Sequence, residues 1–82
     1  MYKILLLSQA QKDLDEFRGK IFQQVKDKIL SLSKNPLPQG CLKLTAEEGY
    51  RLHSGNYRVI HRINDKDKTV YIYRIKHRKE AY

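Results

Sequence analysis

The spacing of apolar residues along the first half of the chain predicts one strand followed by a helix. Residues 2–7 form a short apolar run, which has the length of a single buried strand and is too short for a helix. Ala10, Leu14 and Phe17 then recur at helical spacing. Ser8 is the expected N-cap of this helix, and Gly19 is expected to break it.

A second amphipathic helix is predicted to begin at Lys20. Its apolar stripe consists of Ile21, Phe22, Val25, Ile29 and Leu32. The helix should end before Asn35, because Pro36 and Pro38 lack the backbone N–H that a helix needs and restrict the residues before them. The two helices therefore form a hairpin.

In the last third of the chain the period changes to that of β-strands. Strands are expected over residues 50–53, 57–64 and 69–75, separated by the turn-forming segments 54–56 and 65–68. Alternation along the second of these strands divides its side chains between two faces. One face carries Tyr57, Val59, His61 and Ile63, and the other carries Arg58, Ile60 and Arg62.

These elements predict a single α+β domain over residues 1–82, with an N-terminal strand, a helical hairpin and three antiparallel strands. Both helices should cover one face of one sheet, which leaves the other face for function. The first strand must also pair, so we expect a mixed sheet with one parallel contact reached through the helical crossover.

Positive charge is concentrated in the predicted sheet. The formal net charge is +8, and residues 50–82 hold nine Lys and Arg against three Asp and Glu, which gives +6. All three histidines and five of the six tyrosines lie in the same region. Cations, proton carriers and stacking rings therefore occur together, which favours a polyanionic partner such as a nucleic acid.

Several other classes of protein are disfavoured by the sequence. Cys41 is the single cysteine, and no Cys/His spacing is typical of a metal site, so we expect neither disulfide, metal nor cofactor. The apolar run at residues 4–7 is too short for a signal peptide or a membrane span. A cytoplasmic protein without a membrane partner is expected.

Arg58 and Arg78 are the strongest candidates for a phosphate site, because strand pairing can bring their segments together. A guanidinium binds two phosphate oxygens at once and stays charged. Arg51 is expected on the same face. A solvated sheet edge is the alternative interpretation for each arginine alone, but three arginines on one face favour a binding site.

His53 and Tyr82 are candidates for proton transfer. His53 lies two residues after Arg51 and should point the same way; a histidine titrates near neutrality, although many strand histidines have no such role. Tyr82 can either stack on a base or accept a proton, and it is otherwise a frayed end. With no nucleophile or metal motif, these residues suit RNA cleavage by the substrate's own 2′-hydroxyl.

The segments YRLHSGNYRVIHRI (residues 50–63) and IKHRKEAY (residues 75–82), together with the order of elements, resemble the RelE/ParE toxin superfamily over nearly the whole chain. The RelE branch implies a toxin of a toxin–antitoxin pair that cuts messenger RNA in the ribosomal A site, with the ribosome and a cognate antitoxin as partners. By position, Arg58 matches the arginine that binds the scissile phosphate, Arg78 the arginine that stabilises transition-state charge, and Tyr82 the terminal tyrosine.

Two departures leave the division of roles open. Arg51 and His53 stand where the best-known member has lysines, so His53 can act as either acid or base. The ParE branch implies the same fold with a different activity, inhibition of DNA gyrase by binding alone. A basic module without toxic activity is a third interpretation.

Overall fold

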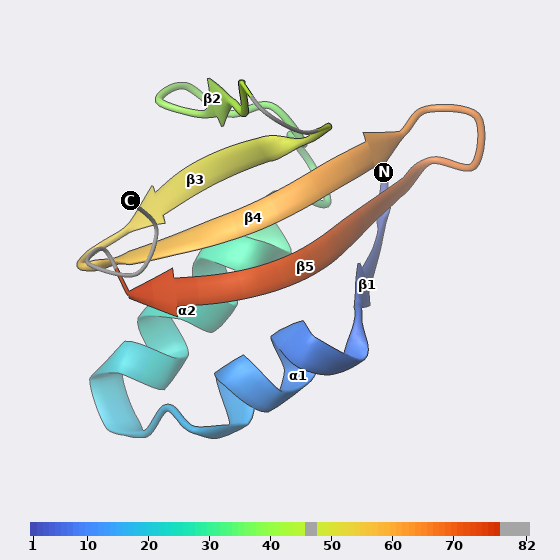
Figure 1. Cartoon of the computed structure of the whole chain (residues 1–82). Helices are drawn as coiled ribbons and strands as arrows, with labels where there is room; N and C mark the ends of the chain where they lie inside the picture. The colour runs from blue at the N-terminus through green and yellow to red at the C-terminus, as the bar shows by residue number, and fades with distance from the viewer. Residues whose placement is uncertain (46–47, 78–82) are drawn as a thin grey trace.

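The computed structural model describes residues 1–45 and 48–77, which form one sheet with two helices on one of its faces (Figure 1). Along the chain the elements are β1 (Lys3–Leu6), α1 (Ser8–Asp15), α2 (Gly19–Ser31), β2 (Leu42–Lys43), β3 (Tyr50–Ser54), β4 (Tyr57–Asn64) and β5 (Thr69–His77). The strand order in the sheet is β1, β5, β4, β3, β2. β1 runs parallel to β5 and the remaining pairs are antiparallel, so the predicted α+β class and its single parallel contact are confirmed.

Three local predictions differ from the structure. Ser8 is the first residue of α1 rather than its N-cap, which is Leu7, and the cap position makes no side-chain hydrogen bond. α1 ends at Asp15, and Gly19 begins α2 instead of ending α1; its φ of 60° lies in the left-handed region, where the chain turns between the helices. The two-residue β2 is a fifth strand, which pairs with the start of β3.

The core lies between the helices and the sheet. Its buried apolar side chains are Ala10, Leu14, Val25, Ile29, Leu32, Leu52, Val59, Val70, Ile72 and Ile75. The predicted helical stripes are thus largely confirmed. Ile21 is the exception, because it is 43% exposed and lies beside the buried face of α2.

The edge of β5 is covered by two different elements in succession. β1 pairs with β5 only from Thr69 to Ile72. Farther along, Asp13 of α1 accepts hydrogen bonds from the Ile75 N–H at 2.9 Å and from Arg74 Nε at 2.8 Å. Desolvation alone would raise the pKa of Asp13, but the hydrogen bonds from Arg74 and Ile75 outweigh it and hold the pKa below its ordinary value.

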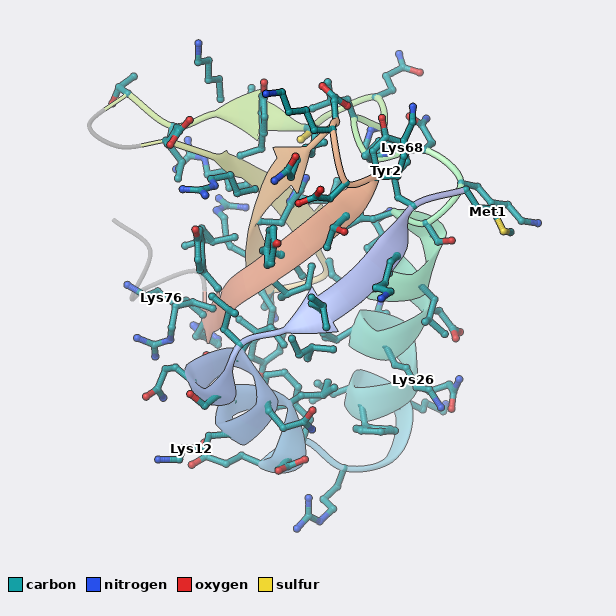
Figure 2. The ribbon with its side chains drawn as sticks, turned by 90° about the vertical axis from the view of Figure 1, so that its right-hand side faces the viewer. Met1, Tyr2, Lys12, Lys26, Lys68 and Lys76 are labelled. Atoms are coloured by element: carbon teal, nitrogen blue, oxygen red, sulfur yellow. The ribbon has the colours of Figure 1, made fainter. Side chains whose placement is uncertain are left out.

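At the opposite end of β5, the start of the chain is tied to the turn between β4 and β5. The Tyr2 hydroxyl donates to Asp65 Oδ1 at 2.6 Å, and Lys68 Nζ lies 5.1 Å from the centroid of the Tyr2 ring. Figure 2 shows Tyr2 and Lys68 together at this end and Lys76 at the other. Both ends of β5 are therefore held by contacts from the N-terminal region.

Replacing Asp13 with Asn should lower the free energy of unfolding at neutral pH by about 1.5–3 kcal/mol, because hydrogen bonds to a charged group are lost. The folded-state pKa of Asp13 is depressed, so its stabilisation is present above the ordinary value of 3.8 and is lost as the pH falls through the lower folded-state value. The difference in the free energy of unfolding between wild type and variant should therefore become smaller in that acidic range. Urea unfolding followed by circular dichroism at several pH values measures both effects.

Asp27→Asn is the matched control, since Asp27 accepts a hydrogen bond from Gln23 at 2.9 Å on an exposed helix surface. That variant should stay within about 0.5 kcal/mol of wild type. An equal decrease in the free energy of unfolding of the two variants would contradict the structural role given to Asp13.

Candidate functional site

The face of the sheet that points away from the helices, here called the open face, carries a row of polar side chains across three strands. Arg58 of β4 is the register partner of His53 on β3 and of Lys76 on β5. Register partners point to the same face of a sheet, so these three side chains lie side by side. They form what we call the basic row.

Arg58 is the most enclosed member of the basic row. It is only 3% exposed, and its Nη1 lies within hydrogen-bond distance of the His53 imidazole, which is itself exposed. A guanidinium can only donate, so a His53 ring nitrogen that hydrogen-bonds to it acts as the acceptor. Histidine is a common proton carrier in proteins, so His53 adds proton-transfer chemistry to the basic row.

Arg51 occupies the next row along the open face. It is the register partner of Ile60, which in turn pairs with Arg74 of β5. Residues two apart on one strand lie about 7 Å apart, so Arg51 is a close neighbour of His53. The predicted grouping of Arg51, His53 and Arg58 on one face thus agrees with the register of β3 and β4.

Lys76 is a member of this cluster that the sequence analysis missed. The last strand was predicted to end at Ile75, but β5 continues to His77 and places Lys76 opposite Arg58. The signal in the sequence is the alternation of basic residues at positions 74 and 76. Arg74 is engaged by Asp13, whereas Lys76 belongs to the basic row.

The other two histidines lie on the helix face. His61 is fully buried, as its inward register predicted, and its Nε2 lies 3.1 Å from the Pro36 carbonyl oxygen. Burial lowers the pKa of His61, although the backbone hydrogen bonds act in the opposite direction. The His77 ring meets the Tyr57 ring edge-on, with centroids 5.2 Å apart. Both histidines therefore contact groups of the fold, the Pro36 carbonyl and the Tyr57 ring, and lie away from the open face.

Arg78 and Tyr82 lie outside the described residues, so their expected roles stay predictions. In residues 1–45 and 48–77, no group of three or more His, Cys, Asp or Glu side chains is arranged to hold a metal ion. Over the same residues, no helix has the length and apolar composition needed to span a membrane. Burial raises the pKa of the Cys41 thiol, which disfavours the nucleophilic thiolate.

The basic row and Arg51 together provide the chemistry of an anion site with a proton acceptor. Arg51, Arg58 and Lys76 can bind phosphate oxygens, and the guanidinium groups can do so through two donors each. His53 provides an imidazole next to the buried Arg58. Charge stabilisation and proton transfer at one phosphodiester are therefore available from three adjacent strands.

Residues 4–82 match the family model described as the ParE toxin of the type II toxin–antitoxin system, parDE. No curated protein sequence matches the chain significantly.

Solved structures of RelE toxins share the fold. One chain of the RelBE2 toxin–antitoxin complex from Mycobacterium tuberculosis matches with a TM-score of 0.82 and 31% identity, over 94% of this chain and 98% of that chain. A chain of the archaeal RelE–RelB complex from Pyrococcus horikoshii matches with a TM-score of 0.79 and 28% identity, over 94% of both chains. The isolated E. coli RelE toxin has a TM-score of 0.80 at 16% identity, over 94% of this chain and 84% of that chain, which shows similarity of fold alone.

The buried His61 should make the stability of the fold sensitive to mild acid. Its folded-state pKa is depressed, so the unfolded chain takes up a proton first as the pH falls below 6.5, and the free energy of unfolding should decrease from there until the folded-state pKa is reached. His61→Gln should remove this slope. Chemical unfolding at a series of pH values provides the test.

His77→Gln serves as the control, because it leaves His61 and its contact with Pro36 in place. This variant should keep the pH dependence of the wild type. A slope that persists unchanged in His61→Gln would show that another group causes it.

Proposed function

Because the chain belongs to the RelE/ParE superfamily of type II toxin–antitoxin toxins, we propose that it is a ribosome-dependent endoribonuclease that cuts messenger RNA in the ribosomal A site. The observation that carries the proposal is the meeting of Arg51, His53 and Arg58 on the open face. Inhibition by binding alone does not require an imidazole beside a buried guanidinium, whereas phosphodiester cleavage uses both a proton carrier and a charge-stabilising group.

In the proposed reaction the messenger supplies its own nucleophile. A ribose 2′-hydroxyl gives its proton to a base and attacks the adjacent phosphorus. The bond to the 5′-oxygen breaks, that oxygen takes a proton from an acid, and the products end in a 2′,3′-cyclic phosphate and a 5′-hydroxyl. DNA lacks the attacking hydroxyl and would be spared.

The residues divide between charge stabilisation and proton transfer. Arg58 binds the scissile phosphate and Arg51 the neighbouring backbone, while Arg78 stabilises charge in the transition state. His53 serves as a proton carrier, with Tyr82 as its partner in proton transfer or as a stacking surface. Arg78 and Tyr82 enter from the resemblance, since they lie outside the described residues.

The ribosome and an antitoxin are the proposed partners. A chain of 82 residues offers little surface to align an RNA strand, so a codon already held on the ribosome would make cleavage efficient. The net charge of +8 would speed docking to ribosomal RNA in the cytoplasm. Since similar chains occur in RelE–RelB complexes, we expect a cognate antitoxin, and an acidic segment would be attracted to the same charge.

Inhibition of DNA gyrase is the second candidate function, and the match to the ParE family model favours it. In that case the open face would serve binding alone. The two functions predict different damage in cells that produce the protein: cleaved messengers in one case, and DNA breaks with intact messengers in the other.

Arg58→Ala should abolish messenger cleavage when the protein is briefly induced in a bacterial host and messenger 5′ ends are sequenced. The loss should be at least roughly 10²-fold, because a charge-stabilising group in a desolvated position is removed. Lys28→Ala, an exposed change on α2, should cut like the wild type. Cleavage unaffected by Arg58→Ala would contradict the site, and DNA breaks without cleaved messengers would favour gyrase.

His53→Gln and Arg51→Gln should separate the two roles in purified, ribosome-dependent cleavage. Loss of a proton carrier lowers kcat by roughly 10² to 10⁴ with little change in KM. Loss of a backbone contact made equally in ground and transition states raises KM with kcat nearly unchanged. Equal changes in the two variants would count against distinct roles for these residues.

A further inference from the structure

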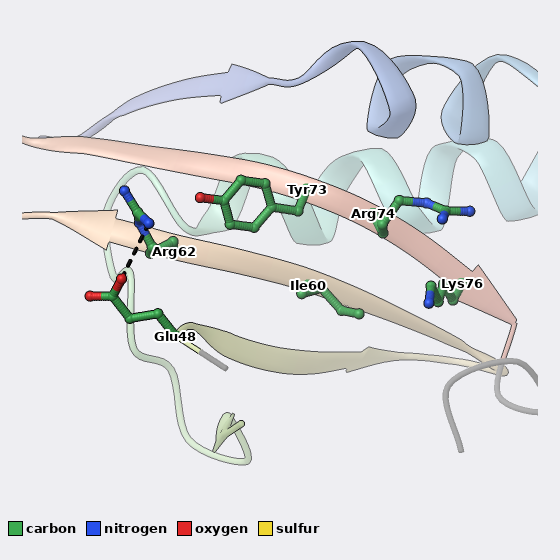
Figure 3. A pocket seen from close by; sticks show the side chains of 6 residues that line it. All are labelled: Glu48, Ile60, Arg62, Tyr73, Arg74 and Lys76. Atoms are coloured by element: carbon green, nitrogen blue, oxygen red, sulfur yellow. Dashed lines mark hydrogen bonds and ion pairs between the residues drawn. The ribbon is translucent and has the colours of Figure 1, made fainter. Parts of the chain in front are cut away.

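The open face continues past the basic row into a groove of about 450 Å³. Six side chains line it: Glu48, Ile60, Arg62, Tyr73, Arg74 and Lys76 (Figure 3). Lys76 belongs to both the groove and the basic row, so the two regions are continuous. The groove lies over β4 and β5, on the side away from the helices.

A β-bulge places Tyr73 in this groove. In the pairing of β4 with β5, Ile60 is the partner of Arg74 while the next residue, His61, is the partner of Ile72. Tyr73 is the additional residue between these pairs. An extra residue in one strand re-aims the side chains around it, so both Tyr73 and its neighbour Arg74 line the groove.

The groove combines an aromatic surface with cations and one carboxylate. Figure 3 shows the Tyr73 ring between Arg62 and Arg74, with Ile60 nearby on β4. The Arg62 guanidinium carbon lies 5.9 Å from the centroid of the Tyr73 ring, and Arg62 Nη1 lies 3.2 Å from Glu48 Oε2. The Arg62 and Glu48 side chains are 41% and 81% exposed, and such surface ion pairs are worth little, so an incoming ligand can displace this one.

Single-stranded RNA is the ligand that fits this combination. Proteins bind unpaired nucleotides by stacking bases on aromatic rings or guanidinium planes and by neutralising the backbone with cations. Tyr73 provides the ring, and Arg62 and Lys76 provide the cations. The Glu48 carboxylate would repel phosphate but can accept hydrogen bonds from an amino group on a base.

We propose that the groove binds one unpaired RNA nucleotide beside the cleavage residues, with its base on Tyr73, its backbone near Lys76 and its base edge near Glu48. This inference rests on the proposed ribonuclease function and extends it, because it assigns base recognition to a region separate from the cleavage residues. The shared chemistry is that of an unpaired nucleotide, whether it comes from the messenger or from ribosomal RNA.

The main test compares Tyr73→Ala with Tyr73→Phe and Tyr71→Ala in ribosome-dependent cleavage. Tyr73→Ala should weaken productive binding roughly ten-fold to a hundred-fold, as expected for the loss of one base stack, while Tyr73→Phe keeps the ring and should stay near wild type. Tyr71 is half-buried like Tyr73, lies on the same strand and does not line the groove, so Tyr71→Ala is the matched control. Circular dichroism and thermal unfolding verify that each variant folds.

Mapping of the cut sites distinguishes the two sources of the nucleotide. If the groove binds the messenger, Tyr73→Ala and Glu48→Gln should change the base preference beside the cut. If it binds ribosomal RNA, Tyr73→Ala should bind ribosomes more weakly, with the base preference unchanged in both variants. Cleavage and ribosome binding equal to those of Tyr71→Ala would overturn the proposal.

A binding measurement keeps this test independent of the proposed function. Fluorescence anisotropy with a short labelled single-stranded oligoribonucleotide at low salt compares wild type with Tyr73→Ala. If the wild type cuts no messenger, the ribonuclease assignment fails; weaker oligonucleotide binding by Tyr73→Ala would still support the groove, and equal binding would refute it. Arg62→Gln is a second variant, since its exposed side chain is replaced without disturbing the core.

Discussion

The pairing of β4 with β5 is the constraint on which the rest of the structure depends. β5 joins β1 on one side to β4 on the other, and through β4 it aligns β3. The register of this pair sets Arg58 opposite Lys76 and Ile60 opposite Arg74, so it decides which side chains share the open face. Its single irregularity, at Tyr73, separates a regular basic row from a groove of different composition.

The two faces of the sheet differ in composition: one is buried and largely apolar, and the other is rich in cations. The helix face is a core of aliphatic side chains, with His61 held by the Pro36 carbonyl as its main polar feature. The open face gathers cations whose mutual repulsion opposes folding. Asp13 and Glu48 offset the charges of Arg74 and Arg62, whereas Arg58 contacts the His53 imidazole, which carries no negative charge to offset that of the guanidinium. Such an arrangement suits anion binding better than stability.

Much of the fold could be predicted because the strongest sequence patterns are uninterrupted. The bounds of β4 and the opposite placement of Arg58 and His61 follow from simple alternation, and the prolines after α2 end the helical hairpin. β2 was missed because two residues carry no periodic signal, and it exists only through its pairing with β3. The Tyr73 groove was missed because alternation fails at a bulge, which is created by tertiary pairing. Arg78 and Tyr82 lie beyond the described residues.

The parallel pairing of β1 with β5 also bears on the protein's synthesis. β1 is made before the other described elements, yet its partner strand β5 is the last of them to be made. Contacts so distant in sequence cannot form early and are slow to close. A nascent chain that lacks β5 has neither the strand that joins β1 to β4 nor the side chain of Lys76. Its anion site therefore cannot be completed while the translating ribosome still holds that part of the chain.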